Sequence, residues 1–239
     1  MIISHQHKFI FLRIPKTAST SIQIALAAVC GPEDVLSGEK IKDGHTEVSK
    51  HYTPQQNLPH HWRNYTLKDW HQIIFKRKPI NYVHARANQA MKIAGKDNWK
   101  RYFKFCFVRN PFDRIISLYY WATKNWEQKH KTPTPAFNDW IYTLPKSKIS
   151  TWSRYTIHNH IAVNFIGRYE SLETGLAHIT NQLNLPELPI QKTKTTIRKD
   201  HRHYSEVISP SCRRYIEKVC SKEMKAFDYS WNDKTLGET

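Results

Sequence analysis

Three times along this chain, a short apolar segment is followed by a polar loop and then by a helical segment. The apolar segments are rich in aromatic and β-branched residues, as buried strands are, and the segments after them carry helix-start signals or helical spacing of apolar residues. Strands that alternate with helices predict an α/β fold with a mostly parallel sheet. The predicted strands are Lys8–Ile14, Tyr102–Arg109 and Asn164–Arg168, and the helices that follow them are Ser19–Val29, Pro111–Lys124 and Leu172–Leu183.

The length of 239 residues fits a single domain, residues 1–239, with a polar excursion that contains Pro and Gly at about residues 31–80. No apolar run approaches the ~18–20 residues of a membrane span. The apolar segment at the start of the chain is too short for a secretory signal, so a soluble cytoplasmic protein is expected.

Three further helices are predicted, at Thr66–Arg77, at His84–Gly95 with Gly95 as C-cap, and at Ser209–Phe227.

The chain is strongly basic, with 37 Lys and Arg against 20 Asp and Glu and a net charge of +17. Such an excess predicts an anionic partner, which could be a nucleic acid, an acidic polysaccharide or a phosphorylated cofactor. The 14 histidines lack acidic or cysteine partners at metal-ligand spacing, so no metal site is predicted. The four cysteines form no C-x-x-C pair and are expected to be free thiols.

The loop "RIPKTASTS" follows the first predicted strand, where ligands bind in such sheets. Backbone N–H groups and the start of the next helix suit an anion there, and Lys16 adds a positive charge. The loop has no glycine and its lysine comes early, unlike a Walker A loop, so a group smaller than a triphosphate is expected. An ordinary N-cap cluster is the structural alternative. The hydroxyl donors would be Thr17, Ser19, Thr20 and Ser21, with the small Ala18 leaving room for the ligand.

A second anion site is predicted at the end of the next strand. Arg109 ends this strand, and Ser117 comes eight residues later in the helix that Pro111 opens. Arginine can bind a phosphate bidentately. The structural alternatives are an ion pair between Arg109 and Asp113 and a helix serine that bonds within its own helix. Two such sites on neighbouring strands predict a ligand with two separated anionic ends.

The two segments together resemble the motifs of sulfotransferases that use 3′-phosphoadenosine 5′-phosphosulfate (PAPS). "RIPKTASTS" resembles the motif that takes the 5′-phosphosulfate, and "FVRNPFDRIISLYY" resembles the motif that takes the 3′-phosphate. "NFIGRYESLETGLAHITNQLNLP" and "FDYSW" are similar to later segments of the carbohydrate branch (sulfotransferase family 2), which includes the heparan sulfate 2-O-sulfotransferases. The resemblance implies a P-loop-like three-layer α/β/α sandwich, PAPS as cofactor and no required metal.

The resemblance also implies site residues. The candidates for the base that takes the acceptor proton are three of the histidines between the two motifs, namely His45, His51 and His84, and the resemblance favours His84 in "VHARA". Lys16 would stabilise charge on the leaving group. The 5′ site would comprise Arg13, Lys16, Thr17, Ala18, Ser19, Thr20 and Ser21, the 3′ site Arg109 and Ser117, and a basic loop over the cofactor would contribute Arg198.

The expected acceptor is a carbohydrate, and more narrowly an anionic glycan, bound by about residues 31–80 and by 124–140. Tryptophan faces could stack on sugar rings, although core packing is expected for Trp99 and Trp121. The other candidate tryptophans are Trp62, Trp70, Trp126 and Trp152.

Two other functions fit the sequence less well. A nucleotide or small-molecule kinase would need a glycine loop and carboxylates for Mg²⁺. A nucleic-acid-binding module would gather its basic residues, which are scattered here. The sequence does not predict the oligomeric state.

Overall fold

The sheet at the centre of the protein has six strands in the order β4-β3-β1-β2-β5-β8. The computed structural model describes residues 1–37, 55–56, 74, 82–124, 126–188 and 202–233. β2 pairs parallel with β5, and β5 pairs parallel with β8. The pairs β1–β2, β1–β3 and β3–β4 are antiparallel, so four of these six strands share one direction. The strands are Ile2–Ser4 (β1), Phe9–Leu12 (β2), Val35–Ser37 (β3), Gln55–Gln56 (β4), Phe103–Val108 (β5) and Phe165–Arg168 (β8).

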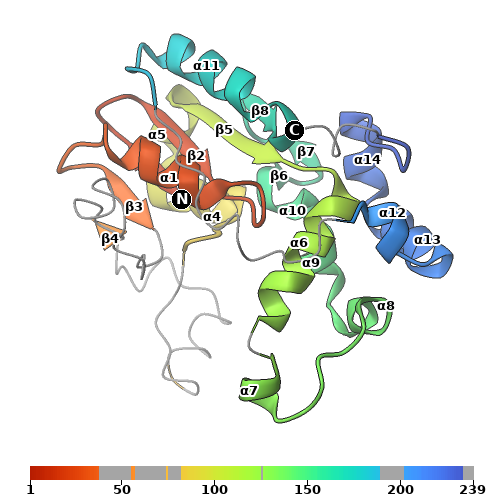
Figure 1. Cartoon of the computed structure of the whole chain (residues 1–239). Coiled ribbons are helices and arrows are strands. Elements are labelled where there is room, and N and C mark those ends of the chain that lie inside the picture. Colours follow the sequence, from red (N-terminus) through yellow and green to blue (C-terminus); the bar gives the residue numbers. More distant parts are fainter. Residues whose placement is uncertain (38–54, 57–73, 75–81, 125, 189–201, 234–239) are drawn as a thin grey trace.

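Helices cover both faces of this sheet, which confirms the predicted three-layer α/β fold (Figure 1). Side chains alternate between the faces along each strand. On β5, Phe105 and Phe107 join the core beneath one pair of helices, whereas Cys106 and Val108 join the core on the other side. The first face packs against α1 (Ser19–Ala27) and α11 (Leu172–Leu183), and the second against α4 (Ala87–Ala94), α5 (Lys96–Arg101) and α10 (Trp152–Tyr155).

A third apolar cluster lies beyond the end of β5, between helices only (Figure 1). Phe112, at the start of α6, stacks on Tyr204 with ring centroids 5.4 Å apart and meets the edge of Trp231 at 4.8 Å. This packing anchors the first turn of α6, the helix that begins where β5 ends. The cluster draws on α6 (Pro111–Thr123), α8 (Phe137–Trp140), α9 (Lys146–Ile149), α12 (Tyr204–Val207) and α13 (Pro210–Val219).

Several predicted elements are confirmed. α11 has the predicted bounds, α6 ends one residue early, and Gly95 caps α4 with a φ of 81°, a conformation that glycine adopts readily. The first predicted strand is also present as β2, and it pairs with β1, a strand that was not predicted. One prediction needs correction, because the predicted terminal helix is two helices, α13 and α14 (Ser221–Phe227), separated at Cys220.

The helix predicted at Thr66–Arg77 lies outside the described residues except for Ile74, and most of the excursion at about 31–80 is also outside them. In the described ranges, no helix combines the length and the apolar character needed to cross a membrane. The remaining short elements are α7 (Trp126–His130), β6 (Thr156–Ile157), β7 (His160–Ile161) and the 3₁₀ turns at Ile141–Thr143 and Tyr169–Ser171.

Close packing of α11 on the sheet depends on glycine at Gly167. A Cβ atom added to Gly167 would lie 2.3 Å from Cε1 of Phe107, whose side chain is fully buried and has no room to swing away. We expect Gly167→Ala to lower the free energy of unfolding by about 1–3 kcal/mol, the usual cost of overpacking. Urea denaturation measures this change. Thr174→Ala, at an exposed position of α11, is the matched control, and equal stability of the two variants would contradict the packing argument.

Candidate functional site

The loop between β2 and α1 makes its turn without glycine. Lys16 and Ala18 both have left-handed backbones, with φ of 69° and 54°. This conformation costs residues other than glycine roughly 1–2 kcal/mol each. The Thr17 hydroxyl donates a hydrogen bond to the carbonyl of Ile14 at 3.0 Å and holds the turn together. The loop therefore takes the sharp course of a phosphate loop, while a lysine occupies one of the two strained positions.

The start of α1 has no side-chain N-cap. Its N-cap residue is Ala18, whose methyl group cannot accept a hydrogen bond from the first turn of the helix. The N-cap cluster considered as an alternative is therefore not what this Ser/Thr segment forms. Ser19, Thr20 and Ser21 lie inside the first turn instead. The first N–H groups of a helix and its dipole favour a negative charge at this position.

Arg13 joins this helix to His84. Its guanidinium is almost fully buried and its Nη2 donates to Oγ1 of Thr20 at 3.0 Å. Its backbone carbonyl lies 3.1 Å from Nδ1 of His84. The predicted base and the predicted anion loop are therefore in direct contact, although they are 71 residues apart in the chain.

The environment of His84 favours the neutral imidazole. Burial, together with the positive charges of Arg13 and Arg154, lowers the pKa of His84 to about 3. A carbonyl oxygen can only accept a hydrogen bond, so in the neutral ring Nδ1 carries the proton that is donated to Arg13. Nε2 then carries the lone pair. Nε2 is therefore the nitrogen of His84 at which a proton would be accepted.

Arg154 is a site residue that the sequence reading missed. Its Nη1 donates to the backbone carbonyl of His84 at 2.8 Å. Burial, followed by repulsion from Arg86 and Arg114, lowers the pKa of Arg154 to about 10. Within the described part of the chain, its buried Nε has no hydrogen-bond partner. Arg154 lies on the short helix α10, far from both sequence motifs, so no spacing signal points to it.

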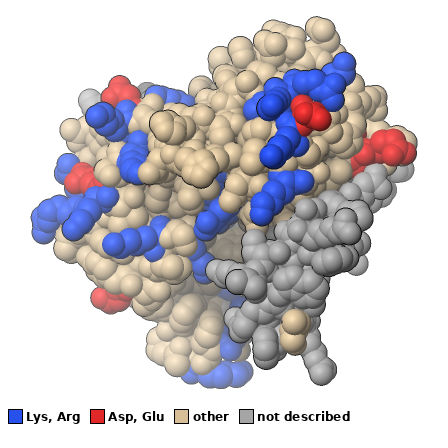
Figure 2. Space-filling model, turned by 180° about the vertical axis from the view of Figure 1, so that it is seen from behind, with Lys and Arg blue, Asp and Glu red and all other residues tan. Residues whose placement is uncertain are grey.

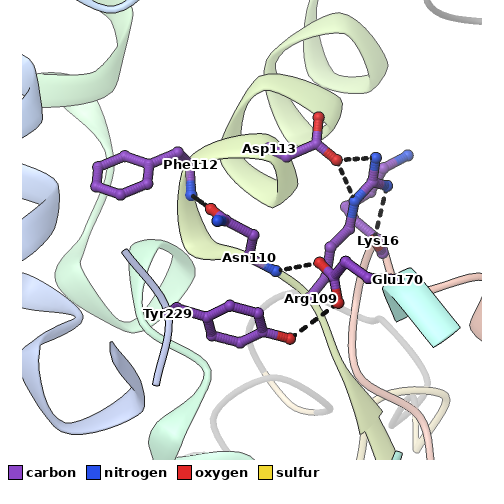
Figure 3. Close-up of polar contacts among 7 residues, drawn as sticks. All are labelled: Lys16, Arg109, Asn110, Phe112, Asp113, Glu170 and Tyr229. Atoms are coloured by element: carbon purple, nitrogen blue, oxygen red, sulfur yellow. Dashed lines mark hydrogen bonds and ion pairs between the residues drawn. The ribbon is translucent and has the colours of Figure 1, made fainter. Parts of the chain in front are cut away.

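Arg109 connects the two predicted anion sites. It forms an ion pair with Asp113, as the structural alternative proposed, and its Nη1 donates to the backbone carbonyl of Lys16 at 3.2 Å (Figure 3). The guanidinium carbon also lies 4.0 Å from the ring centroid of Tyr169. These contacts fix the orientation of the Arg109 side chain. The guanidinium N–H groups that bond neither Asp113 nor the Lys16 carbonyl lie outside the ion pair.

Glu170 fixes the backbone beside Arg109. Its Oε1 accepts a hydrogen bond from the N–H of Asn110 at 2.7 Å, and its Oε2 accepts from the Tyr229 hydroxyl at 3.0 Å (Figure 3). Asn110 also caps α6, since its Oδ1 accepts from the N–H of Phe112 at 3.0 Å. Burial and the Glu170 carboxylate raise the pKa of Tyr229 above its usual value. Glu170 thus joins the ends of β8 and β5 to the "FDYSW" segment.

Ser117 and Trp121 follow Asp113 at successive four-residue steps on α6 and therefore share its face. Ser117 is half-buried. Trp121 is 50% exposed, and Nζ of Lys16 lies 5.9 Å from its ring centroid. The expectation that Trp121 packs in the core is therefore wrong, whereas Trp99 is buried as expected.

Comparison with known proteins identifies the family. The sequence profile of the sulfotransferase family (sulfotransferase family 2) matches residues 1–230. The chain belongs to this family. An uncharacterized protein of Archaeoglobus fulgidus is 32% identical over 98 residues, which are 39% of this chain and 77% of that protein. No solved structure matches the chain.

The protein is accordingly a sulfotransferase, a transferase that moves a sulfuryl group from a donor to a hydroxylated acceptor. The loop after β2, Arg109 and His84 of this sulfotransferase lie together through the contacts described above. Arg198, His45 and His51 lie outside the described residues. Within the described residues, no group of three or more His, Cys, Asp or Glu side chains is placed to hold a metal ion.

The low pKa of His84 predicts a specific loss of stability in acid. Below pH 6.5 the unfolded chain takes up a proton at this histidine, whereas the folded protein does not until about pH 3. Stability therefore falls as the pH decreases through this window. We expect His84→Gln to reduce the loss of unfolding free energy between pH 7 and pH 4.5 by about 2 kcal/mol.

Urea denaturation at the two pH values measures this difference. His160→Gln removes an exposed histidine of β7 and controls for the substitution itself. An unchanged pH dependence in His84→Gln would show that His84 is not held in a cationic, buried environment.

Proposed function

We propose that the protein transfers the sulfuryl group of PAPS to a hydroxyl of an anionic carbohydrate. The observation that carries this proposal is the hydrogen bond from Arg109 Nη1 to the Lys16 carbonyl, 3.2 Å long. It brings together the two segments that resemble the 5′ and 3′ motifs of PAPS-dependent enzymes. A donor with two anionic ends would meet both at one edge of the sheet.

The described residues fit the two ends of such a donor. The 5′ side has the first turn of α1, which lacks a side-chain N-cap, and the ammonium group of Lys16. The 3′ side has the fixed guanidinium of Arg109 and the hydroxyl of the half-buried Ser117. The residues proposed for the 5′ side are Arg13, Lys16, Thr17, Ala18, Ser19, Thr20 and Ser21. Arg198, which lies outside the described residues, is also proposed to bind the donor.

His84 is proposed as the base. PAPS would supply an activated sulfuryl group, whose bond to the phosphate oxygen breaks as a bond to the acceptor oxygen forms. His84 Nε2 would take the proton of the acceptor hydroxyl, with Nδ1–H held by the Arg13 carbonyl. The cations that keep His84 neutral also attract the anionic donor, and its negative charge would raise the pKa of His84 toward the range in which a base works best.

Lys16 is proposed to stabilise the negative charge that develops on the leaving phosphate. Electrostatic stabilisation of this kind often contributes more to catalysis than any other single effect. The loop geometry supports this role, because the left-handed backbone of Lys16 places its carbonyl against Arg109 and its ammonium group above Trp121. The ammonium group of Lys16 therefore lies beside α6, the helix that also carries Ser117.

An anionic acceptor is supported by the charge around His84. Arg86 is exposed, and its charge acts on Arg154, which contacts the His84 carbonyl. Guanidinium groups that repel one another are stabilised when a carboxylate or sulfate binds between them. Across the face in Figure 2, Lys and Arg outnumber Asp and Glu and occur in several separate places rather than one block. The described residues of the face in Figure 2 therefore do not present the single continuous basic surface that a nucleic-acid groove would need.

Binding of the desulfated product, 3′-phosphoadenosine 5′-phosphate (PAP), tests the donor. We expect PAP to bind tightly in calorimetry and ATP to give no response at the same concentration. Arg109→Ala should weaken PAP binding at least tenfold. Arg109→Lys should also weaken it, because lysine lacks the planar guanidinium group that can donate two hydrogen bonds to one phosphate. Arg101→Ala removes an exposed arginine before the other end of β5 and is the matched control. Tight ATP binding that requires Mg²⁺ would instead indicate a kinase.

Replacement of His84 tests the base. We expect His84→Ala to lower turnover by about 10²–10⁴-fold, the usual contribution of a general base, while PAP binding is retained. Added imidazole should restore part of the rate if the missing group acts by taking a proton. Sulfuryl transfer is followed with labelled PAPS on desulfated heparin, unsulfated chondroitin and the neutral glucan laminarin. Near wild-type turnover in a folded variant that binds PAP would remove His84 from the mechanism.

A further inference from the structure

Trp121 is a large apolar side chain left half exposed beside the proposed donor site. It is 50% exposed and belongs to none of the three buried clusters. Its neighbours in the chain behave differently, since Tyr119 and Tyr120 pack against the helical cluster beyond β5. An exposed tryptophan at a functional site is a candidate for ligand contact, because covering its ring removes apolar surface from water, which is favourable.

The position of Trp121 is set by α6. Asp113, Ser117 and Trp121 lie on one face of the helix, one turn apart. Asp113 contacts Arg109, and Trp121 contacts the ammonium group of Lys16 at 5.9 Å. Trp121 therefore lies one turn farther from the end of β5 than the groups proposed for the 3′-phosphate, and it adjoins the cation proposed for the breaking bond.

We propose that Trp121 is the platform on which a sugar ring of the acceptor stacks, and that it determines specificity for ring-shaped acceptors. This inference rests on the proposed function. The C–H face of a pyranose is apolar and matches a flat indole ring, while its hydroxyls stay free for polar contacts. A ring stacked on Trp121 lies next to Lys16, so one of its hydroxyls is carried to the place where the sulfuryl group is transferred.

Two other roles would place a tryptophan here. The ring could hold Lys16 through the cation–π contact, or it could stack on the adenine of the donor. The first role predicts a lower turnover with an unchanged acceptor KM. The second predicts weaker PAP binding. Acceptor stacking predicts neither, because it changes the affinity for the acceptor alone.

The experiment compares Trp121→Ala with Trp121→Phe and the wild-type protein, using desulfated heparin, unsulfated chondroitin and laminarin as acceptors. We expect Trp121→Ala to raise the KM for each polysaccharide that the wild type sulfates about tenfold or more. Trp121→Phe should stay within about threefold, because a flat ring remains. PAP binding and the slow hydrolysis of PAPS in the absence of acceptor should be unchanged in both. Tyr142→Ala removes a similarly exposed aromatic ring on the 3₁₀ turn Ile141–Thr143 and is the control.

The outcomes separate this inference from the proposed function. An unchanged acceptor KM in Trp121→Ala, a lower rate of PAPS hydrolysis or weaker PAP binding would overturn the stacking role while the wild-type protein stays active. If the wild-type protein binds no PAP, the proposed donor is wrong. If it binds PAP but sulfates none of the three polysaccharides, the carbohydrate acceptor is wrong, and the stacking role fails with it.

Discussion

The parallel pairing of β2 with β5 is the constraint on which the rest of the site depends. It aligns Leu12 with Cys106, so both strands end at the same edge of the sheet. Parallel strands bring their carboxyl ends together, and here this places the loop containing Lys16 beside Arg109. The sheet register thus creates the contact between two segments whose contacting residues are 93 positions apart in the chain. Neither segment alone forms a site for a donor with two anionic ends.

Buried positive charge governs the electrostatics of this site. Arg13 is almost completely buried, and burial together with neighbouring arginines lowers the pKa of Arg154. Burial, together with the charges of Arg13 and Arg154, keeps His84 neutral, and the Arg13 carbonyl orients its ring. The proposed anionic donor would be attracted by these charges and would relieve their mutual repulsion. Its binding would then also raise the proton affinity of the proposed base.

Local sequence signals predicted the elements that carry this site, because their apolar periodicity and caps act within a few residues. The strand that ends just before Arg109, the helix opened by Pro111 and the cap at Gly95 all follow from such signals. The signals failed where the outcome depends on packing. The β1 arm of the hairpin is only three residues long, and Trp121 carries no local mark that distinguishes it from a core tryptophan. The helix break at Cys220 also went unpredicted, since no Pro or Gly marks it.

The sequence by itself determined the α/β class, the excess of positive charge and the two segments that resemble sulfotransferase motifs, since these depend only on composition and on neighbouring residues. Only the tertiary structure decided which groups act together. His84 meets Arg13, Arg154 meets His84, and Glu170 joins Asn110 to Tyr229, in each case across at least 59 residues of chain. The pKa of His84 follows from its burial and its contacts with Arg13 and Arg154, because burial and Coulomb interactions depend on distance in space and not on distance along the chain.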